Sequence, residues 1–312
     1  MDRKKRPVQK VYAFGAVMAT PSGDDRKKGR RPVERRLEFI DFRLFWEGHI
    51  NRGDLVSFFG MSVPQASSDL AEYQMAAKGN AVYDKTRKTY VAGKKFKPVF
   101  FKPSADEYLA QLRLIQAGIL AENEAWAVRL PSYSIVPILR RRIEPGILRR
   151  ILDAIRTRAS LRVNYQSKSS PQPKLRWIAP HALGFDGFRW HARAWCDEHQ
   201  DFRDLVLTRI LEVGEVRADD VDPARDAGWQ REVTLKLSPH PKLKGGSRRA
   251  VELDYGMTDG EISAVMRVCM AYYFMRQLGL DQEHAEVDTD RYPLVLVNRI
   301  EVEEAMKEAG RC

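Results

Sequence analysis

The spacing of apolar residues changes near Ser160, and this change limits the folds open to the chain. Before it, outside one short hairpin signal near "DKTRK", apolar residues recur at the spacing of one helix face. After it, Leu161, Val163 and Tyr165 alternate with polar residues, as in a strand with one buried face. A single helical bundle or a single sheet is therefore excluded. A chain of 312 residues can bury the cores of two or three domains, and we expect an α+β protein.

Residues 32–97 carry the signals of three short helices followed by a β-hairpin. Asn51 and Asp54 have the spacing of a capping box, and Ser62 and Gln65 repeat that spacing at the start of the third helix. The polar tip "DKTRK" between short apolar runs predicts the hairpin. Three helices and a hairpin are typical of a winged helix-turn-helix domain that binds DNA.

The third helix is the one expected to read DNA, because recognition helices contact base edges from their N-terminal end. Its apolar side chains share one face and should pack inward: Val63, Ala66, Leu70 and Tyr73. Polar side chains then point outward, and hairpin cations would reach the DNA backbone or the minor groove. The candidate DNA-binding residues are Ser62, Pro64, Gln65, Ser67 and Ser68 on the helix and Lys85, Arg87 and Lys88 at the hairpin tip. The alternative is a helical domain that docks a protein.

The formal net charge of +11 favours a polyanionic partner, either nucleic acid or an anionic membrane. Much of this excess lies in residues 1–31, which hold ten lysines and arginines against three aspartates. We expect these residues to form a disordered basic leader. A flexible arm that follows DNA phosphates is one alternative, and a membrane-surface or protein adaptor is another.

Several classes of function are not expected. Cys196, Cys269 and Cys312 lie far apart, so neither a disulfide framework nor a zinc site is predicted. This use of cysteine favours a reducing cytoplasm. No apolar run has the length of a membrane span, and the N-terminus lacks a signal-peptide core, so we expect no membrane partner. Paired carboxylates, a glycine-rich phosphate loop and metal-ligand spacings are missing from the sequence. We therefore expect no cofactor, no metal and no enzymatic activity, with a nucleic-acid-processing enzyme as the remote alternative.

The middle of the chain predicts a linker and a small β domain. Residues 98–132 should form a helical linker with a helix that Ser104 and Glu107 open. Residues 133–222 should form a domain with a helix from Pro145 to about Thr157 and about five short strands. A small antiparallel sheet of this kind curls into an Sm/SH3-like partial barrel with a concave pocket. The buried side of the helix is expected to hold Ile147, Leu148, Ile151, Leu152 and Ile155.

The stretch "GFRWHARAWCDEHQDFRDLVLTRI", residues 187–210, predicts a hairpin with much charge on one face. Alternation places Arg189, His191, Arg193 and Trp195 together on its first strand, and the return strand, 205–210, ends on Arg209. Such a face is either solvated or binds an anion. The cations could instead pair with the aspartates of the same hairpin: Asp197, Asp201 and Asp204.

Residues 223–312 are expected to form a C-terminal α/β domain. The pattern predicts a strand at 231–239, a basic loop at 242–249, a second strand at 250–257 and a helix at 261–278. A late apolar strand and a short helix at 301–310 complete it. Cys269 lies in an apolar stripe, which predicts a core position rather than a reactive site.

The central domain resembles the WYL domains of bacterial transcriptional regulators. The resemblance rests on the segments "RWIAPHAL", "FRWHARAWC" and "FRDLVLTRI", and Trp190-His191-Ala192 stands in the place of the Trp-Tyr-Leu triplet. The order of winged helix, helical connector, WYL domain and C-terminal extension over residues 32–305 resembles the CapW- and BrxR-type repressors of phage-defence islands. The resemblance implies a homodimer to which the C-terminal domain contributes.

The resemblance also implies a repressor that binds inverted repeats upstream of its own operon, with a WYL domain that senses a nucleotide-like or nucleic-acid ligand. An activator of the same architecture is the alternative. Arginine offers a planar fork for phosphate, histidine and serine offer directional hydrogen bonds, and tyrosine offers a stacking ring. The residues expected to line one concave ligand-binding face are Tyr165, Ser167, His181, His191, Arg193 and Arg209.

Overall fold

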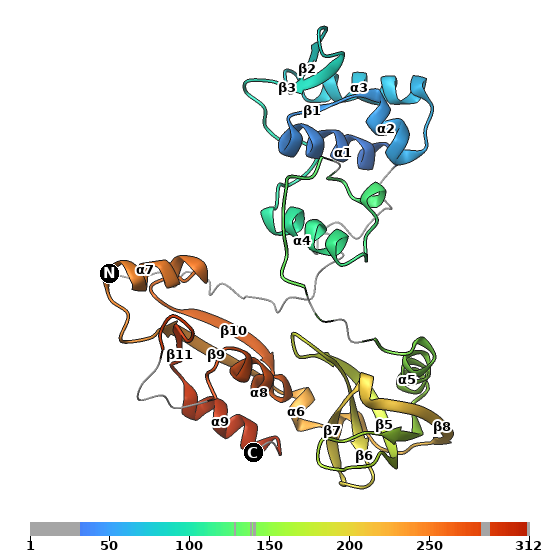
Figure 1. Cartoon of the computed structure of the whole chain (residues 1–312), viewed down its shortest axis with the longest axis vertical. Helices are drawn as coiled ribbons and strands as arrows, with labels where there is room; N and C mark the ends of the chain where they lie inside the picture. The colour runs from blue at the N-terminus through green and yellow to red at the C-terminus, as the bar shows by residue number, and fades with distance from the viewer. Residues whose placement is uncertain (1–31, 128, 138, 140–141, 282–287, 311–312) are drawn as a thin grey trace. The chain divides into compact units, whose positions relative to one another are not determined.

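Two compact units make up the described chain, one ending at Leu139 and the other beginning at Arg142 (Figure 1). The predicted basic leader, residues 1–31, lies outside the described residues. The computed structural model describes residues 32–127, 129–137, 139, 142–281 and 288–310.

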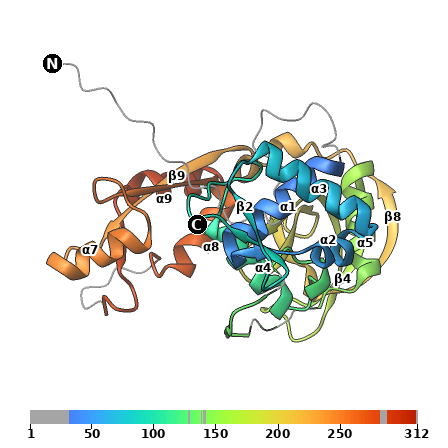
Figure 2. The same cartoon turned by 90° about the horizontal axis from the view of Figure 1, so that it is seen from above.

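The first unit opens with three helices and a three-stranded sheet in the order β1-β3-β2, which is the predicted winged-helix arrangement. The three helices lie against one another (Figures 1 and 2). They share an apolar core that includes Ile40, Leu55 and Leu70. The elements are α1 (Pro32–Glu47), β1 (His49–Ile50), α2 (Arg52–Phe59), α3 (Val63–Ala76), β2 (Ala81–Asp84) and β3 (Thr89–Ala92).

Local signals set the helix ends as predicted. The Asn51 side chain accepts from the backbone N of Asp54 at 3.0 Å, and the Asp54 carboxylate accepts from the backbone N of Asn51 at 2.7 Å. Gly60 ends α2 with a φ of 64°, which glycine adopts without strain. Ser62 caps α3 by accepting from the backbone N of Gln65 at 3.4 Å.

The predicted inward face of α3 needs one correction. Ala66, Leu70 and Tyr73 are fully buried as expected, but Val63 is 53% exposed. Val63 is the first residue of the helix, and it lies ahead of the turns that the other two helices cover. An apolar side chain therefore stands on the outer surface of this helix.

A buried carboxylate ties the winged helix to the chain that follows it. Asp41 of α1 is fully buried and accepts a hydrogen bond from the Tyr73 hydroxyl. It also accepts from the backbone N atoms of Val99 at 2.6 Å and Phe100 at 2.7 Å. Burial, and then the hydrogen bond to Asp41, raise the pKa of Tyr73. The hydroxyl is thus held as a donor to the carboxylate.

The predicted linker helix forms and belongs to the first unit. Ser104 opens it by accepting from the backbone N of Glu107 at 3.2 Å. Farther on, Trp126 packs edge-on against Phe39 and Phe42 of α1, with ring centres 5.8 and 5.5 Å apart. The two elements here are α4 (Ala105–Gln116) and the 3-10 turn η1 (Glu122–Glu124).

The second unit starts with a helix and a five-stranded antiparallel sheet in the order β7-β6-β5-β4-β8, close to the prediction (Figure 1). Irregular pairing at Pro180 and Ala182 bends the sheet, because bulges increase local twist. Ile151 and Ala154 of α5 close its apolar core. The elements are α5 (Pro145–Thr157), β4 (Ala159–Tyr165), β5 (Lys174–Phe185), β6 (Trp190–Cys196), β7 (Asp201–Val206), η2 (Leu207–Arg209) and β8 (Ile210–Ala218).

Three details of this sheet domain differ from the prediction. The return strand of the hairpin stops at Val206, and Arg209 lies in the 3-10 turn η2 instead. Residues 210–218 form a separate strand that pairs with β4, because the turn redirects the chain across the sheet. Leu152 is 39% exposed, since Ile151 and its neighbours along the helix fill the buried stripe.

A three-stranded sheet in the order β10-β9-β11 forms the rest of the second unit, and α8 and α9 share its apolar core. The predicted first strand, late strand and last helix are confirmed. The elements are η3 (Pro223–Arg225), α6 (Ala227–Gln230), β9 (Glu232–Pro239), α7 (Gly245–Asp254), β10 (Ile262–Arg267), α8 (Val268–Gln277), β11 (Leu294–Leu296) and α9 (Arg299–Glu308).

Between residues 245 and 267 the sequence prediction is wrong. Residues 245–254, predicted as loop and strand, form α7, where Arg248 and Arg249 pair with Glu252 at helical spacing. Residues 262–267, predicted as the start of a helix, form β10, because pairing with β9 along the whole strand overrides local preference. Among the described residues, no helix combines the length and apolar character needed to span a bilayer.

Removal of the Tyr73 hydroxyl tests the role of Asp41. A buried carboxylate left one donor short costs about 1–3 kcal/mol. We therefore expect the α3 amides of full-length Tyr73→Phe to exchange about 10- to 100-fold faster in hydrogen–deuterium exchange. Tyr83→Phe removes an exposed hydroxyl from β2 and should leave these rates unchanged. Equal rates in Tyr73→Phe and the wild type would contradict this role.

Candidate DNA-binding and ligand-binding sites

The first turns of α3 present most of the predicted polar side chains to solvent. Ser62, Pro64, Gln65 and Ser68 are exposed. Ser67 is half-buried, and its hydroxyl donates to the backbone carbonyl of the first helix residue at 3.0 Å. Its proton is therefore used within the helix, although its lone pairs can still accept.

A chain of hydrogen bonds holds Gln65 in one orientation. Arg36 of α1 donates from Nε at 2.6 Å and from Nη2 at 3.1 Å to the two carboxylate oxygens of Asp69. Asp69 is 1% exposed, and its Oδ1 also accepts from Nε2 of Gln65 at 3.0 Å. Asp69 is not among the residues predicted from the sequence, although an acidic residue four positions after Gln65 on a helix is the available signal.

The tip of the β2–β3 hairpin presents the three predicted cations. Asp84 closes the turn by accepting from the backbone N atoms of Thr86 at 2.9 Å and Arg87 at 3.0 Å. Lys85, Arg87 and Lys88 are all exposed. The Arg87 guanidinium lies 3.8 Å from Asp84 but is 76% exposed, so solvent screens this pair. The tip can therefore offer cations to a phosphate backbone.

A buried ion cluster lies on the face of β6 that carries the predicted hairpin charges. Arg193 is 3% exposed and donates from Nε and Nη2 to the two oxygens of Asp226 at 2.7 and 2.8 Å. Nε2 of His181, on β5, lies 2.9 Å from the same carboxylate. Arg193 also donates from Nη1 to Asp204 of β7 at 3.2 Å. Asp226 is 1% exposed and caps α6 by accepting from the backbone N of Trp229 at 3.1 Å.

The members of this cluster keep one another charged. Burial alone would raise the pKa of Asp226, but hydrogen bonds from Arg193 and His181 outweigh burial and hold that pKa at about 2. Burial alone would lower the pKa of Arg193, but the hydrogen bond to Asp226 raises it above its ordinary value. The arginine and the carboxylate are therefore both ionised at neutral pH.

The cluster also joins the five-stranded sheet to the C-terminal part of the unit. Asp204 accepts a hydrogen bond from the Tyr273 hydroxyl of α8 at 2.9 Å. Burial raises the pKa of Tyr273 to about 12, so this hydroxyl keeps its proton. Gly228 of α6 comes close to Arg193, because a Cβ atom there would lie 3.2 Å from Nη2. A larger residue at that position would crowd the guanidinium.

His191 has a separate acidic partner. Its Nε2 lies 2.9 Å from Asp186, and the histidine is 3% exposed. Asp186 also accepts from Nε of Arg189 at 2.8 Å and from the backbone N of Phe188 at 2.8 Å. Against the opposing effect of burial, the bonds from His191, Phe188 and Arg189 lower the pKa of Asp186 to about 2. These bonds fix the turn between β5 and β6.

The remaining predicted ligand residues lie where the end of β4 meets η2. They are Tyr165, Ser167 and Arg209. The Tyr165 side chain is buried, and its hydroxyl accepts from the backbone N of Val206 at 3.2 Å. The Arg209 carbonyl accepts from the backbone N of Gln166 at 3.0 Å, which sets Arg209 next to the end of β4. Ser167 and Arg209 are both half-buried.

Arg176 is a cation at this place that the sequence analysis does not single out. Its guanidinium lies 5.1 Å from the centre of the Tyr165 ring, within reach of a cation–π interaction. Its Nη2 lies 3.3 Å from Glu198, and its side chain is 9% exposed. Its Nε has no hydrogen-bond partner among the described residues. The available signal is its place at the head of "RWIAPHAL".

The six predicted ligand residues differ in the groups that they contact. They occupy three places: around Asp226, beside Asp186, and at the end of β4. The alternative is that the cations of this face pair with aspartates of the same hairpin. One such pair is present, between Arg193 and Asp204. The bidentate partner of Arg193, however, is Asp226, which lies outside the hairpin. Asp201 pairs with Arg203 of the same hairpin, and Asp197 pairs with Arg217 of β8.

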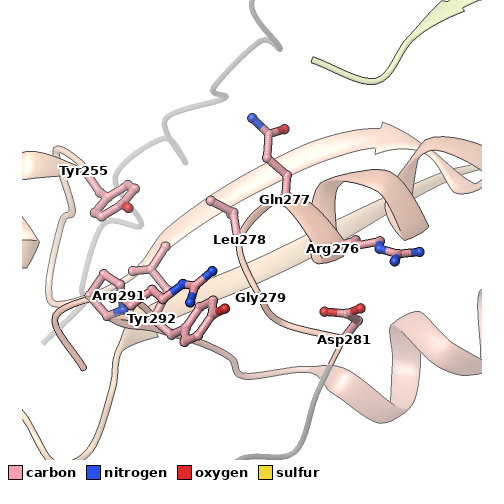
Figure 3. Close-up of a pocket in the computed structure, with 10 residues that line it drawn as sticks. Tyr255, Arg276, Gln277, Leu278, Gly279, Asp281, Arg291 and Tyr292 are labelled. Carbon is pink, nitrogen blue, oxygen red and sulfur yellow. The ribbon is translucent and has the colours of Figure 1, made fainter. Parts of the chain in front are cut away.

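A cavity of about 480 Å³ lies in the C-terminal part of the second unit (Figure 3). Its walls carry both signs of charge, from Arg276, Arg291 and Asp281. The Arg291 guanidinium lies 5.3 Å from the ring centre of Tyr292, which also lines the cavity. None of the six predicted ligand residues reaches its walls. This cavity is therefore separate from the predicted ligand site.

Within the described residues, one group has the chemistry of a metal site. Ligand atoms of Cys196, Glu198 and His199 lie within 4.8 Å of one another in the β6–β7 turn. Cys196 is only 1% exposed, and the Arg176 guanidinium already neutralises Glu198. A fixed positive charge beside the carboxylate opposes a cation there. We assign no metal to this turn.

Three family models match the chain. The BrxR transcriptional regulator winged helix-turn-helix domain matches residues 32–114, and the WYL domain matches residues 146–214. The BrxR transcriptional regulator C-terminal dimerization domain matches residues 232–302. These matches confirm the predicted order of a winged helix, a WYL domain and a C-terminal dimerization domain.

Relatives named DNA-binding transcriptional repressor CapW cover most of the chain. The relative from Stenotrophomonas maltophilia is 43% identical over 282 residues, which span 90% of this chain and 94% of the relative. The relative from Escherichia coli (strain KTE188) is 39% identical over 293 residues, spanning 91% and 96%. The relative from Pseudomonas aeruginosa is 37% identical over 287 residues, spanning 92% and 96%.

Among solved structures, proteasome accessory factor B/C (PafBC) of Arthrobacter aurescens matches at 15% identity with a TM-score of 0.24, over 93% of this chain and 51% of that one. A likeness this low supports no argument. The relatives are named as repressors, which confirms the expectation that the chain is not an enzyme. At 37–43% identity over nine-tenths of its length, and with all three domains matched, the chain belongs to the CapW family of DNA-binding transcriptional repressors.

Proposed function

We propose that this chain is a homodimeric repressor that acts in the cytoplasm on an inverted-repeat operator of its own phage-defence operon. We further infer that an anionic ligand, either nucleotide-like or nucleic acid, controls DNA binding through the WYL domain. The names of the relatives support repression, and the dimerization domain supports the dimer. A two-fold dimer presents two identical heads, which favours an inverted repeat. The phage-defence role rests on the resemblance in domain order.

The winged-helix domain supplies the DNA-binding half of the proposal. The exposed polar side chains on the first turns of α3 suit base edges, and the cations at the hairpin tip suit phosphates. The proposed DNA-binding residues remain Ser62, Pro64, Gln65, Ser67, Ser68, Lys85, Arg87 and Lys88.

Fluorescence anisotropy tests this half directly. The probes are the duplex upstream of the gene and a scrambled duplex of equal length, each titrated at several salt concentrations. Sequence-specific binding predicts a large difference in affinity that persists as salt rises, because base contacts depend less on salt than phosphate contacts do. Equal affinities that fall together with salt would contradict sequence-specific binding.

One observation carries the ligand half: the Asp226 carboxylate is held by Arg193 and His181. The planar fork of arginine binds carboxylate and phosphate with the same bidentate geometry. We infer that Asp226 stands where a phosphate of the ligand would bind. A ligand with several phosphates brings more charge than one carboxylate and could replace it. The proposed ligand-binding residues remain Tyr165, Ser167, His181, His191, Arg193 and Arg209.

The position of Asp226 suggests how the ligand would act. Asp226 caps α6, and β9 of the dimerization domain follows at Glu232. Replacement of its carboxylate would free α6 from Arg193 and loosen the WYL sheet from the dimerization domain. A ligand that binds this released state more tightly shifts the population toward it. We propose that the shift changes the spacing of the two heads and lowers operator affinity.

A transcriptional activator with the same architecture is the alternative. The sign of regulation depends on where the operator lies relative to the promoter, which the protein does not fix. A reporter driven by the upstream promoter, measured with and without the gene, separates the two. A repressor lowers the reporter signal and an activator raises it.

The hairpin tip should contribute affinity without sequence preference. We expect Lys85→Ala/Lys88→Ala to weaken binding to operator and scrambled duplexes by the same factor. The slope of log affinity against log salt should become shallower by about 0.9 for each phosphate that the variant no longer neutralises. Lys168→Ala removes an exposed lysine from the loop after β4 and serves as the matched control. A weakening confined to the operator would show instead that these lysines read bases.

If Asp226 competes with the ligand, neutralising it should improve ligand binding. Asparagine can still cap α6, so Asp226→Asn removes the charge and keeps the cap. We expect a short fluorescein-labelled single-stranded oligonucleotide to bind this variant about tenfold more tightly than the wild type. Asp222→Asn is the matched control, because Asp222 caps η3 in the same segment without contacting Arg193. A folded Asp226→Asn variant that binds the oligonucleotide no more tightly than the wild type would contradict the competition.

A further inference from the structure

The hydrogen bond between Gln65 and Asp69 decides which way the Gln65 amide faces. A carboxylate only accepts hydrogen bonds, so the amide nitrogen must be the atom beside Asp69, at 3.0 Å from Oδ1. The bidentate contact with Arg36 keeps Asp69 itself in place. Gln65 therefore has one amide hydrogen left to donate and a carbonyl oxygen that can accept. The contact with Asp69 fixes which side of the amide each group is on.

This fixed pair of groups matches one base edge in the major groove. Adenine presents the N7 acceptor beside the N6 donor, whereas guanine presents two acceptors, N7 and O6. An amide that keeps its nitrogen toward Asp69 can donate to adenine N7 and accept from adenine N6. The same amide would place its carbonyl oxygen against guanine O6, which leaves two acceptors facing each other. Gln65 so held discriminates adenine from guanine.

An exposed apolar side chain stands two residues before Gln65. Val63 is 53% exposed at the first position of α3. The methyl group of thymine is the apolar feature of the major groove, and aliphatic side chains contact it. Other side chains of the helix discriminate less. The Ser68 hydroxyl can donate to or accept from any base, and Gln74 is occupied with the backbone carbonyl of Ala81 at 2.9 Å.

We propose that α3 reads A·T base pairs, with Gln65 contacting adenine, Val63 contacting a thymine methyl group, and Asp69 acting as the positioning residue that fixes the Gln65 amide. This inference rests on the proposed role of α3 as the reading helix. It assigns a base preference to two positions of each operator half-site.

A scan of the upstream duplex tests the Gln65 contact. Each A·T pair is changed to G·C at matching positions of both half-sites, and the affinity of the full-length protein is measured by anisotropy. The wild type should bind about 10- to 100-fold more weakly for each half-site in which one particular A·T pair is changed, as expected when a bidentate base contact is removed. Gln65→Ala should lose this discrimination at that pair and keep it at the others.

Modified bases separate the two contacts. Replacing that adenine by 7-deazaadenine removes only N7, so it should weaken wild-type binding and leave Gln65→Ala unaffected. Replacing a thymine by deoxyuridine removes only the methyl group. At one thymine this should weaken wild-type binding by about threefold to fivefold, the worth of one buried methyl group, and leave Val63→Ala unaffected.

Asp69→Asn tests the positioning role. An asparagine can turn its own amide nitrogen, which is a donor, toward Gln65. Both hydrogens of the Gln65 amide are then free to face the two acceptors of guanine, N7 and O6. The ratio of affinities for the A·T and G·C duplexes should fall toward one while binding itself persists. A purely structural role would weaken both duplexes equally and leave the ratio unchanged. Gln172→Ala, an exposed glutamine in the second unit, is the matched control and should behave as the wild type does.

The outcomes distinguish this inference from the proposed function. If Gln65→Ala keeps the wild-type pattern at every A·T pair, or if Val63→Ala responds to deoxyuridine as the wild type does, the base assignment is wrong although the protein is still a sequence-specific repressor. If the wild type shows no difference between the operator and a scrambled duplex, the reading role of α3 fails and this inference fails with it.

Discussion

Arg193 cannot stay buried without an anion, and this requirement organises the second unit. A guanidinium with 3% exposure needs compensating charge, because burying an unpaired charge costs several kcal/mol. Asp226 and Asp204 supply that charge from two different segments. One of them starts the helix that precedes the dimerization domain, and the other accepts from Tyr273 of α8. The charge balance of a single arginine thus links the WYL sheet to the rest of its unit.

Buried aspartates have a related task in the winged helix. Asp41 accepts hydrogen bonds from Tyr73 of α3 and from the backbone of the chain that follows the hairpin. Asp69 pairs with Arg36 and orients Gln65 at the surface. Each unit therefore has a buried carboxylate that sets the geometry of a proposed binding surface. Asp69 does so for the proposed DNA-binding surface, and Asp226 does so for the proposed ligand site. The difference is that we propose exchange of the Asp226 contact for an external anion, whereas Asp69 orients a neighbour by staying in place.

Features set by neighbours in the sequence could be predicted, and features set by distant residues could not. The caps at Asn51 and Ser62 involve residues three positions apart, so the helix ends of the winged helix followed from the sequence. Residues 262–267 look helical alone, and only their pairing with β9 makes them a strand. Strand alternation correctly placed His191 and Arg193 on one face of β6. Their surroundings depend on Asp226, which is 33 residues beyond Arg193 and carries no local signal.

The central claim is that Asp226 holds the ligand site closed until an external anion replaces it. Hydrogen–deuterium exchange of the full-length dimer, with and without a saturating single-stranded oligonucleotide, measures this directly. If the claim is correct, the amides of residues 222–230 lose protection when the oligonucleotide binds, because α6 is released from Arg193. A bound oligonucleotide that leaves these amides equally or more protected would contradict the claim. The anion would then bind elsewhere, and the Arg193–Asp226 pair would be a fixed structural link.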